Sequence, residues 1–277
     1  MKSVIAFFAL FVVLIPTSLA EDDHPRPFDE NYDAMSVVDE AMTMAMAENK
    51  RLLLVLGANW CHDSRGLAHH FEDPELARLL ADNYVLRFID VHWFTENRSV
   101  MNRFGIPTVY GTPTVFIIDP VDETLLNRQE RSRWTSAASA PIEEVRAYFS
   151  RWANPSSDID LIETSLIFQS MMIEIELFED EEGVRMASAF DDIARWRAME
   201  SDDRPNNFGD LAIEADEWRR QLPRHVSALR EQARNMVETA LAEIVGDDSI
   251  TNETIAILDN SDPDLGLAFE RHDSETW

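Results

Sequence analysis

The apolar run at residues 52–56 (LLLVL) restricts the possible folds of this chain more than any other segment. The run does not alternate with polar residues, which is typical of a strand that is buried on both faces. Gly57 follows directly, and glycine commonly interrupts regular structure. A chain built around such a strand is expected to cover the two faces of its sheet with other elements.

Helices and further strands alternate around this run. The segment 73–75 (DPE) supplies an N-cap aspartate, a first-turn proline and a first-turn acid, which together predict the start of a helix. We expect helices at 33–49, 61–70, 73–83, 97–104 and 141–152, and strands at 52–56, 84–91, 114–118 and 124–128. This alternation predicts an α/β domain over residues 32–153, with a small mixed sheet flanked by helices.

The composition changes after this domain. Residues 154–157 (NPSS) predict a linker. Beyond it, residues 158–277 are acidic, strand signals fade, and apolar residues recur at helical spacing. Two of the helices expected here cover 208–222 and 224–245, with Pro223 between them. The C-terminal region is therefore expected to be mainly α-helical.

Residues 1–20 have the layout of a secretory signal peptide. A short positive start precedes an apolar run at 4–15, and small residues lead to Ala20. The run is short for a membrane span, although an uncleaved N-terminal anchor is the alternative. Removal of the segment leaves no apolar stretch long enough to cross a membrane, so we expect a periplasmic or secreted protein. Residues 21–31 are polar with two prolines and are expected to form a flexible leader.

The charge balance excludes one class of partner. The chain has 52 acidic residues against 24 lysine and arginine residues, a net charge of −28. Such a surface repels phosphate groups, so we expect neither nucleic acid nor an anionic membrane surface as a partner. The single cysteine, Cys61, excludes an internal disulfide and a cysteine-rich metal site.

Cys61 lies in the segment 58–64 (ANWCHDS), where the predicted strand ends and a helix begins. Free N–H groups and the positive end of the helix dipole favour a thiolate at such a position. Trp60 can shield one side of the sulfur. Ser64 lies on the same helical face, three residues further on, and can donate a hydrogen bond to the thiolate. At a strand-to-helix junction we expect Cys61 to be partly exposed.

A second motif, Gly-Thr-Pro at residues 111–113, directly precedes the predicted strand at 114–118. Together with the apolar strand that leads into Trp60 and Cys61, this motif resembles the thioredoxin family, in particular its secreted members. The resemblance covers residues 32–153. It implies a thioredoxin-like mixed sheet flanked by helices, here followed by a helical region for which no family is assigned.

The resemblance also implies roles for individual residues. In this family the proline corresponding to Pro113 is in a cis peptide and faces the active cysteine. Thr112 then offers backbone groups to an extended substrate segment, a form of strand addition. Cys61 and Ser64 are accordingly the catalytic candidates, and Trp60, Thr112 and Pro113 are the substrate-binding candidates.

Two departures from the family pattern limit the chemistry. The usual Cys-x-x-Cys pair is here Cys61-His62-Asp63-Ser64, so a hydroxyl replaces the second thiol. A dithiol reductant needs that thiol to resolve its mixed disulfide with the substrate. In addition, Val55 occupies the position where the family usually buries an acid. A dithiol mechanism is therefore not available to this chain alone.

Three functions remain open at this point. The first is monothiol thiol–disulfide exchange on protein clients, in which Cys61 forms a mixed disulfide that a client thiol, or a small thiol such as glutathione, releases. The second is a non-catalytic thioredoxin-fold module that binds or holds a protein partner. The third is a metal or redox-sensing site of Cys61 with His62, His69 or His70, although the last two lie far along the same helix. The motifs imply no nucleotide or metal cofactor.

Overall fold

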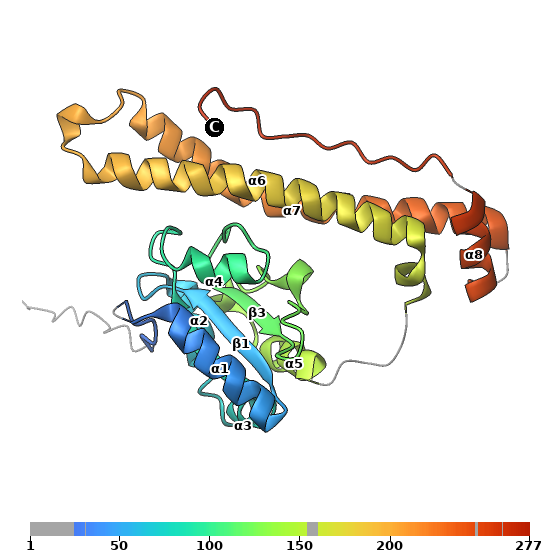
Figure 1. Cartoon of the computed structure of the whole chain (residues 1–277), viewed down its shortest axis with the longest axis horizontal. Helices are drawn as coiled ribbons and strands as arrows, with labels where there is room; N and C mark the ends of the chain where they lie inside the picture. Colours follow the sequence, from blue (N-terminus) through green and yellow to red (C-terminus); the bar gives the residue numbers. More distant parts are fainter. Residues whose placement is uncertain (1–24, 31, 154–159, 247–248, 262) are drawn as a thin grey trace, which may run out of the picture.

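The structure is a computed structural model that describes residues 25–30, 32–153, 160–246, 249–261 and 263–277. The signal peptide expected at 1–20 and the linker expected at 154–157 lie outside the described residues. An α/β body lies beneath a long pair of helices (Figure 1). Within the described part of the chain, no helix combines the length and apolar character needed to cross a membrane.

The α/β body is built on a mixed sheet. Its elements are α1 (Ala34–Glu48), β1 (Arg51–Gly57), α2 (His62–His70), α3 (Pro74–Asn83), β2 (Tyr84–Asp90), α4 (Arg98–Arg103), β3 (Thr114–Ile118) and α5 (Ile142–Ala153), with 3-10 turns at Arg128–Glu130 and Ala137–Ser139. Over the described residues the sheet has three strands in the order β2-β1-β3, with β1 parallel to β2 and antiparallel to β3. The predicted mixed sheet with flanking helices is confirmed.

The central strand β1 is buried on both faces, as its unbroken apolar run predicted. Successive side chains of a strand point to opposite faces of the sheet. Leu52, Leu54 and Leu56 pack with α1 on one face, in an apolar cluster that continues into the C-terminal helices. Leu53 and Val55 pack on the other face with α2, α3 and α5. Each of these five side chains is fully excluded from water.

The fourth strand predicted at 124–128 is wrong. In place of a strand, the segment forms one isolated bridge, between Ile118 and Leu125. The reason is the side chain of Asn127, which is buried and imitates a strand backbone. Its Oδ1 accepts from the Ile117 N–H and its Nδ2 donates to the Val115 carbonyl, both at 2.8 Å. The amide group therefore takes up edge hydrogen bonds of β3 that a further strand would use.

The segment before α1 is anchored at Phe28, where we had expected a flexible leader. Phe28 is 1% exposed and packs in the core between the sheet and α5. Its N–H donates to Asn59 Oδ1, and its carbonyl accepts from Asn59 Nδ2. Gly57 leaves the space for this ring, because a Cβ at Gly57 would lie 2.6 Å from the Phe28 Cζ. The N-terminal segment thus packs directly against the turn that leads to Cys61.

The C-terminal region is mainly helical, as predicted. It comprises a 3-10 turn at Leu161–Thr164, α6 (Leu166–Ala198), a second 3-10 turn at Ser201–Asp203, α7 (Phe208–Val245) and α8 (Asn252–Ser261). The predicted break at Pro223 is wrong, because α7 continues through it. Proline removes one helical hydrogen bond, here to the carbonyl of Arg219. The buried stripe against α6 includes Leu222 and Val226 on either side of the proline, and this packing keeps the helix continuous.

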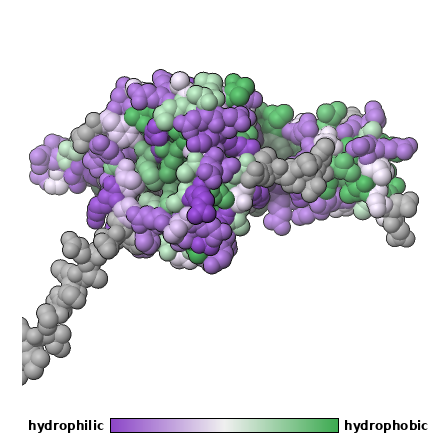
Figure 2. Space-filling model, turned by 90° about the horizontal axis from the view of Figure 1, so that it is seen from below, coloured by the Kyte–Doolittle hydropathy of each residue, from purple (hydrophilic) through white to green (hydrophobic). Residues whose placement is uncertain are grey.

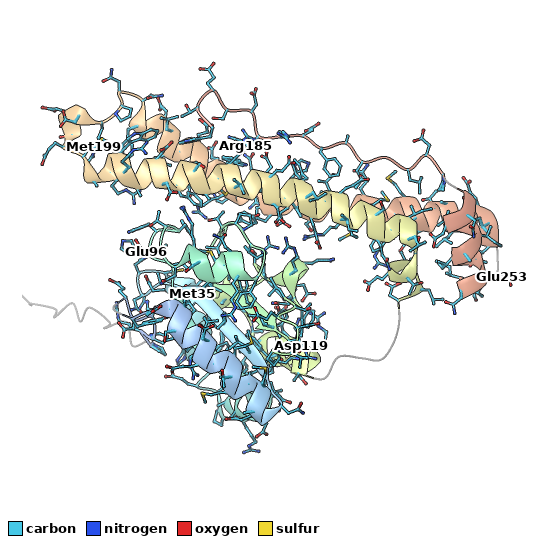
Figure 3. The ribbon with its side chains drawn as sticks, in the orientation of Figure 1. Met35, Glu96, Asp119, Arg185, Met199 and Glu253 are labelled. Atoms are coloured by element: carbon cyan, nitrogen blue, oxygen red, sulfur yellow. The ribbon has the colours of Figure 1, made fainter. Side chains whose placement is uncertain are left out.

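An extended tail at 263–277 runs back along the helical pair (Figure 1). Arg185 of α6 projects toward it, labelled in Figure 3, and its Nη2 donates to the carbonyls of His272 and Trp277. The ring of His272 stacks on Trp218 of α7 with centroids 4.4 Å apart. The tail is therefore part of the packed structure of the helical pair.

The helical pair is also packed against the α/β body. One apolar cluster includes residues of α1, β1, α6, α7 and α8. Ion pairs add to it, among them Arg131–Glu179 at 2.5 Å and Arg128–Asp180 at 2.8 Å. Away from this contact, hydrophilic residues predominate on the face shown in Figure 2, in keeping with the net charge of −28. The helices thus cover one side of the domain that carries the predicted site.

Candidate functional site

Cys61 lies at the start of α2, at the N-cap position. Its backbone is extended, with φ −82° and ψ 120°, and its carbonyl accepts the first helical hydrogen bond, from the Arg65 N–H at 3.2 Å. The turn between β1 and α2 is closed by a hydrogen bond from the Cys61 N–H to the Ala58 carbonyl. The sulfur is therefore next to the free N–H groups of a helix N-terminus, where a negative charge is stabilised.

The sulfur of Cys61 contacts the Thr112 loop. Cys61 Sγ donates to the carbonyl oxygen of Thr112 at 3.3 Å, and the Thr112–Pro113 peptide is cis. The loop is closed by a hydrogen bond of 2.8 Å from Thr114 Oγ1 to the Gly111 carbonyl. Cys61 is 9% exposed, less than the partial exposure that we expected, because the Thr112 loop lies over it. The structure thus brings together three of the five candidates, Cys61, Thr112 and Pro113.

Ser64 is placed differently from the expectation. It is fully buried, and its Oγ accepts from the Ala58 N–H at 3.4 Å. Among the described residues no hydrogen bond joins Ser64 to Cys61. Gly57 is the close neighbour of this hydroxyl, since a Cβ at Gly57 would lie 2.6 Å from it. In this structure Ser64 therefore supports the turn before Cys61.

Trp60, expected to shield the sulfur, is 42% exposed and packs against the loop that follows β2. Its ring stacks on Trp93 with centroids 4.3 Å apart and planes 10° from parallel. Its Nε1 donates to the His92 carbonyl at 3.1 Å, which fixes the ring over the loop that follows β2. Phe94 meets the Trp60 ring edge-on. Trp60 and its neighbours form an aromatic surface next to Cys61.

The loop after β2, with His92, Trp93 and Phe94, borders the candidate site through its contacts with Trp60. His92 and Phe94 have positive φ angles, 46° and 69°, which are uncommon for residues other than glycine. Asp90 holds the first of them, because its Oδ2 accepts from the His92 N–H at 2.9 Å. Non-glycine residues in this conformation cluster at functional sites. A Trp-Phe pair after a buried strand was the only sequence signal for this loop.

A buried acid lies near the motif, but not on the strand where the family usually places one. Val55 is fully buried in β1, while Asp90 at the end of β2 is paired with Gly57 across the sheet and is 3% exposed. Burial raises the pKa of Asp90, an effect that its hydrogen bond from His92 only partly offsets. The sequence did not single out Asp90.

Two of the three histidines considered as ligands, His69 and His70, have partners away from the sulfur. His69 Nδ1 lies 3.0 Å from Glu72 Oε2, and His70 Nε2 lies 3.0 Å from the Ala137 carbonyl. His62 is the first residue of α2, directly after Cys61. Over the described residues, no group of three or more potential ligand side chains that could hold a metal ion is present. The metal hypothesis receives no support from this geometry.

The helical pair reaches the site loops from the other side. Arg219 of α7 donates from Nη1 to the Tyr110 carbonyl at 3.1 Å, two residues before Thr112. The Tyr110 ring is buried against α6, where a Cβ at Gly183 would lie 3.3 Å from its hydroxyl oxygen. Phe190 of α6 stacks on Phe94, with centroids 5.2 Å apart. The C-terminal region therefore holds both loops that border Cys61.

One comparison with known proteins falls on the α/β body. Residues 33–120 match the model of a thioredoxin-like family. Among solved structures, the crystal structure of a disulphide isomerase from Xylella fastidiosa Temecula1 is similar, with 27% sequence identity and a TM-score of 0.43. The match covers 46% of this chain and 96% of the other. No curated protein matches the sequence. The chain therefore carries a thioredoxin-like domain at residues 33–120, with a mainly helical region after it.

Proposed function

We propose that this protein is exported and performs monothiol thiol–disulfide exchange on protein clients through Cys61. The observation that carries the proposal is the contact between Cys61 Sγ and the Thr112 carbonyl at 3.3 Å, at the N-terminus of α2. A client segment that pairs with the backbone of Thr112 presents its own sulfur to Cys61. The match to a thioredoxin-like family supports thiol–disulfide exchange as the general class of chemistry.

The exchange needs no external oxidant or reductant. The Cys61 thiolate attacks one sulfur of a client disulfide, a new S–S bond forms to that sulfur, and the other client sulfur leaves as a thiolate. A different client thiolate then attacks the client sulfur of the mixed disulfide, and Cys61 leaves as a thiolate. The client ends with a changed pairing and no net change in oxidation state. A small thiol such as glutathione can take the second step instead, remaining on the client.

The second thiol of a dithiol enzyme is absent, and this makes the exchange monothiol. Cys61 is the single cysteine of the chain, and Ser64 is buried with its hydroxyl bonded to the Ala58 N–H. Neither residue can resolve a mixed disulfide from within the chain. The lifetime of the mixed disulfide is therefore set by thiols of the client or of the surroundings.

A non-catalytic binding module is the second candidate, and the 9% exposure of Cys61 is the observation that favours it. A client sulfur must reach Sγ along the line of the breaking S–S bond, and the Thr112 loop lies close to that sulfur. In this alternative the domain and its helices hold a partner protein, and Cys61 contributes only packing.

Isomerisation of a scrambled client separates the two candidates. The wild-type protein, the Cys61→Ala variant and a protein-free control are incubated with a disulfide-scrambled ribonuclease and glutathione, and recovery of ribonuclease activity is followed. We expect acceleration by the wild type alone. Alkylation of Cys61 by iodoacetamide is measured in parallel, in the native and in the urea-unfolded protein. Equal recovery in all three samples, with native alkylation no faster than unfolded, would overturn the exchange and leave the binding module as the remaining candidate.

Export is tested on the protein in its own cells. We expect the chain in the periplasmic or extracellular fraction, with the mass of a polypeptide that begins at Glu21. A cytoplasmic chain of full mass would overturn this part of the proposal.

A further inference from the structure

We propose that the helical pair supplies the second wall of a client-binding cleft beside Cys61, and that the cleft takes an aromatic client side chain next to an acidic residue. This inference rests on the proposed function and names its substrate class. A cavity of about 390 Å³ lies between the site loops and the helices. We call it the tryptophan cleft. Trp60, Trp93 and Phe94 line it from the α/β body, and Phe190, Ile193 and Ile213 line it from α6 and α7.

The apolar character of the cleft points to a side-chain ligand. Trp60, Trp93 and Ile213 line it while 42%, 46% and 60% exposed, in a protein whose surface is mainly hydrophilic. Exposed apolar residues gathered in one concave place mark binding sites. The stacked indoles of Trp60 and Trp93 offer a ring face or edge to an incoming aromatic ring. An aromatic side chain is therefore the best match in shape and chemistry.

The charged side chains that line the cleft have a net charge opposite in sign to that of the whole chain. Three charged side chains line it: Arg197, Arg219 and Asp216. Asp216 is paired with Arg219 at 2.5 Å. Arg197 lies over the Trp93 ring at 5.2 Å, and no described carboxylate lies within ion-pair distance of it. The lining thus has a net positive charge in a chain of net charge −28, which favours a carboxylate on the ligand.

The position of the cleft makes a client segment its occupant. Trp60 both lines the cleft and immediately precedes Cys61 in the chain. A client segment that pairs with Thr112 and presents a cysteine to Sγ therefore places its neighbouring residues within a few residues' reach of the cleft. The thioredoxin-like motif supplies one wall, and the other comes from helices outside the residues that match the family model.

Peptide binding is tested on a variant that cannot undergo thiol–disulfide exchange. The Cys61→Ala protein is titrated with the peptides Ala-Ser-Phe-Asp, Ala-Ser-Ala-Asp and Ala-Ser-Phe-Lys, and with N-acetylphenylalanine, while tryptophan fluorescence is recorded. We expect Ala-Ser-Phe-Asp to bind roughly tenfold more tightly than either of the other peptides. N-acetylphenylalanine should bind more weakly still, because it lacks the backbone that pairs with Thr112. Equal affinity for the three peptides, or tighter binding of N-acetylphenylalanine, would overturn the proposal.

Matched variants test which residues of the cleft produce the preferences for phenylalanine and for aspartate. Ile213→Asp should abolish the preference for phenylalanine over alanine, while Leu177→Asp, at an α6 position of nearly equal exposure outside the cleft, should retain it. Arg197→Ala should abolish the preference for aspartate over lysine. Arg195→Ala, two residues away and paired with Asp192, should retain it. Equal losses in a variant and its control would show a general structural effect and contradict the assignment.

Exchange is then measured on the wild type, so that the two proposals can fail separately. The probe is the peptide Ala-Cys-Phe-Asp in a mixed disulfide with thionitrobenzoate. Attack by Cys61 on the peptide sulfur forms the new S–S bond and releases coloured thionitrobenzoate with the electron pair. A binding preference without release would remove the proposed exchange and leave the cleft. Release at the same rate from the Ala-Cys-Ala-Asp probe would remove the cleft and leave the exchange.

Discussion

Arg131 of the α/β body and Glu179 of α6 form an ion pair at 2.5 Å in which the two side chains are only 4% and 3% exposed. Arg230 of α7 adds a second contact to Glu179, at 3.0 Å. Burial works against the charge on Glu179, but the two arginines outweigh it and lower the pKa of this carboxyl. One glutamate therefore joins three segments that are far apart in the sequence.

Removal of that glutamate's charge should destabilise the protein strongly. Glu179→Gln leaves Arg131 buried without its ionic partner, and breaking a buried pair costs about 3–5 kcal/mol. Glu144→Gln removes an acid of the same type from an exposed pair, Arg133–Glu144 at 3.7 Å, and should cost less than about 1 kcal/mol. Urea unfolding, followed by fluorescence and circular dichroism, compares the two variants. A loss for Glu179→Gln as small as that for Glu144→Gln would contradict the prediction.

Asp73 should make stability depend on acid pH. Its hydrogen bond and ion pair with Arg146, together with its N-cap bonds to α3, lower the pKa of Asp73 to about 2. A lowered pKa contributes stability that is present above the ordinary aspartate range and is lost as the pH falls toward 2. The difference in melting temperature between the wild type and Asp73→Asn should have its full size at pH 6. It should shrink as the pH falls from about 4 to about 2.

The matched control for Asp73 is Asp33→Asn. Asp33 is the N-cap of α1 and has no arginine partner among the described residues. Asparagine is itself a good N-cap, so this exchange should leave a smaller gap in melting temperature at pH 6. A gap for Asp73→Asn that stays constant from pH 6 to pH 2 would show that the Arg146 pair does not act through ionisation.

Gly57→Ala should destabilise the domain by about 1–3 kcal/mol, the range for overpacking a core. The added Cβ would lie 2.6 Å from both Phe28 Cζ and Ser64 Oγ. Phe28→Ala in the same chain should relieve part of this cost, so the two effects should not add. Gly209→Ala is the control, because nothing lies within 4 Å of that position. Thermal unfolding of the wild type, the two single variants, their double variant and the control decides whether the space at Gly57 is required.

Arg219 should be a positioning residue for the Thr112 loop. Arg219→Ala removes the hydrogen bond to the Tyr110 carbonyl, and one such bond corresponds to roughly a two- to tenfold loss in exchange rate. Both thionitrobenzoate probes should slow, because the loop serves every client, and the phenylalanine probe should slow further, because Arg219 also lines the tryptophan cleft over the Phe94 ring. Arg219→Lys should restore part of the rate. Arg220→Ala is the control, since its contacts are with Asp216 of its own helix. A loss confined to the phenylalanine probe would show that Arg219 acts only through the tryptophan cleft and would contradict its role in positioning the loop.

Local signals were sufficient to predict where the candidate site lies. The apolar run before Cys61 specified a central strand, and the helix that follows it begins at His62. The Gly-Thr-Pro motif predicted Thr112 as a site residue, and the carbonyl of Thr112 contacts the sulfur. These features depend on residues that are close in sequence or on a known family pattern.

Features that depend on distant residues could not be predicted in this way. Asn127 has the turn-forming character of any asparagine, and only the fold shows that its amide replaces a strand edge. Pro223 has a strong tendency to end a helix, which packing against α6 overrides. Arg197 and Trp93 are far apart in the sequence, and nothing in either segment indicates that they meet. The sequence alone therefore could not predict the cleft.

The apolar cluster shared by the sheet and the helices has a consequence for how this molecule can be divided. Buried residues of β1, α6 and α7 belong to the same cluster, so a cut after α5 would expose the inner side of the domain to water. Phe94 and Tyr110, from the two loops of the candidate site, would be among the side chains uncovered. The unit that packs together is thus larger than the unit that family likeness defines, and the familiar half, once excised, would lack the cover that its inner face has in the whole chain.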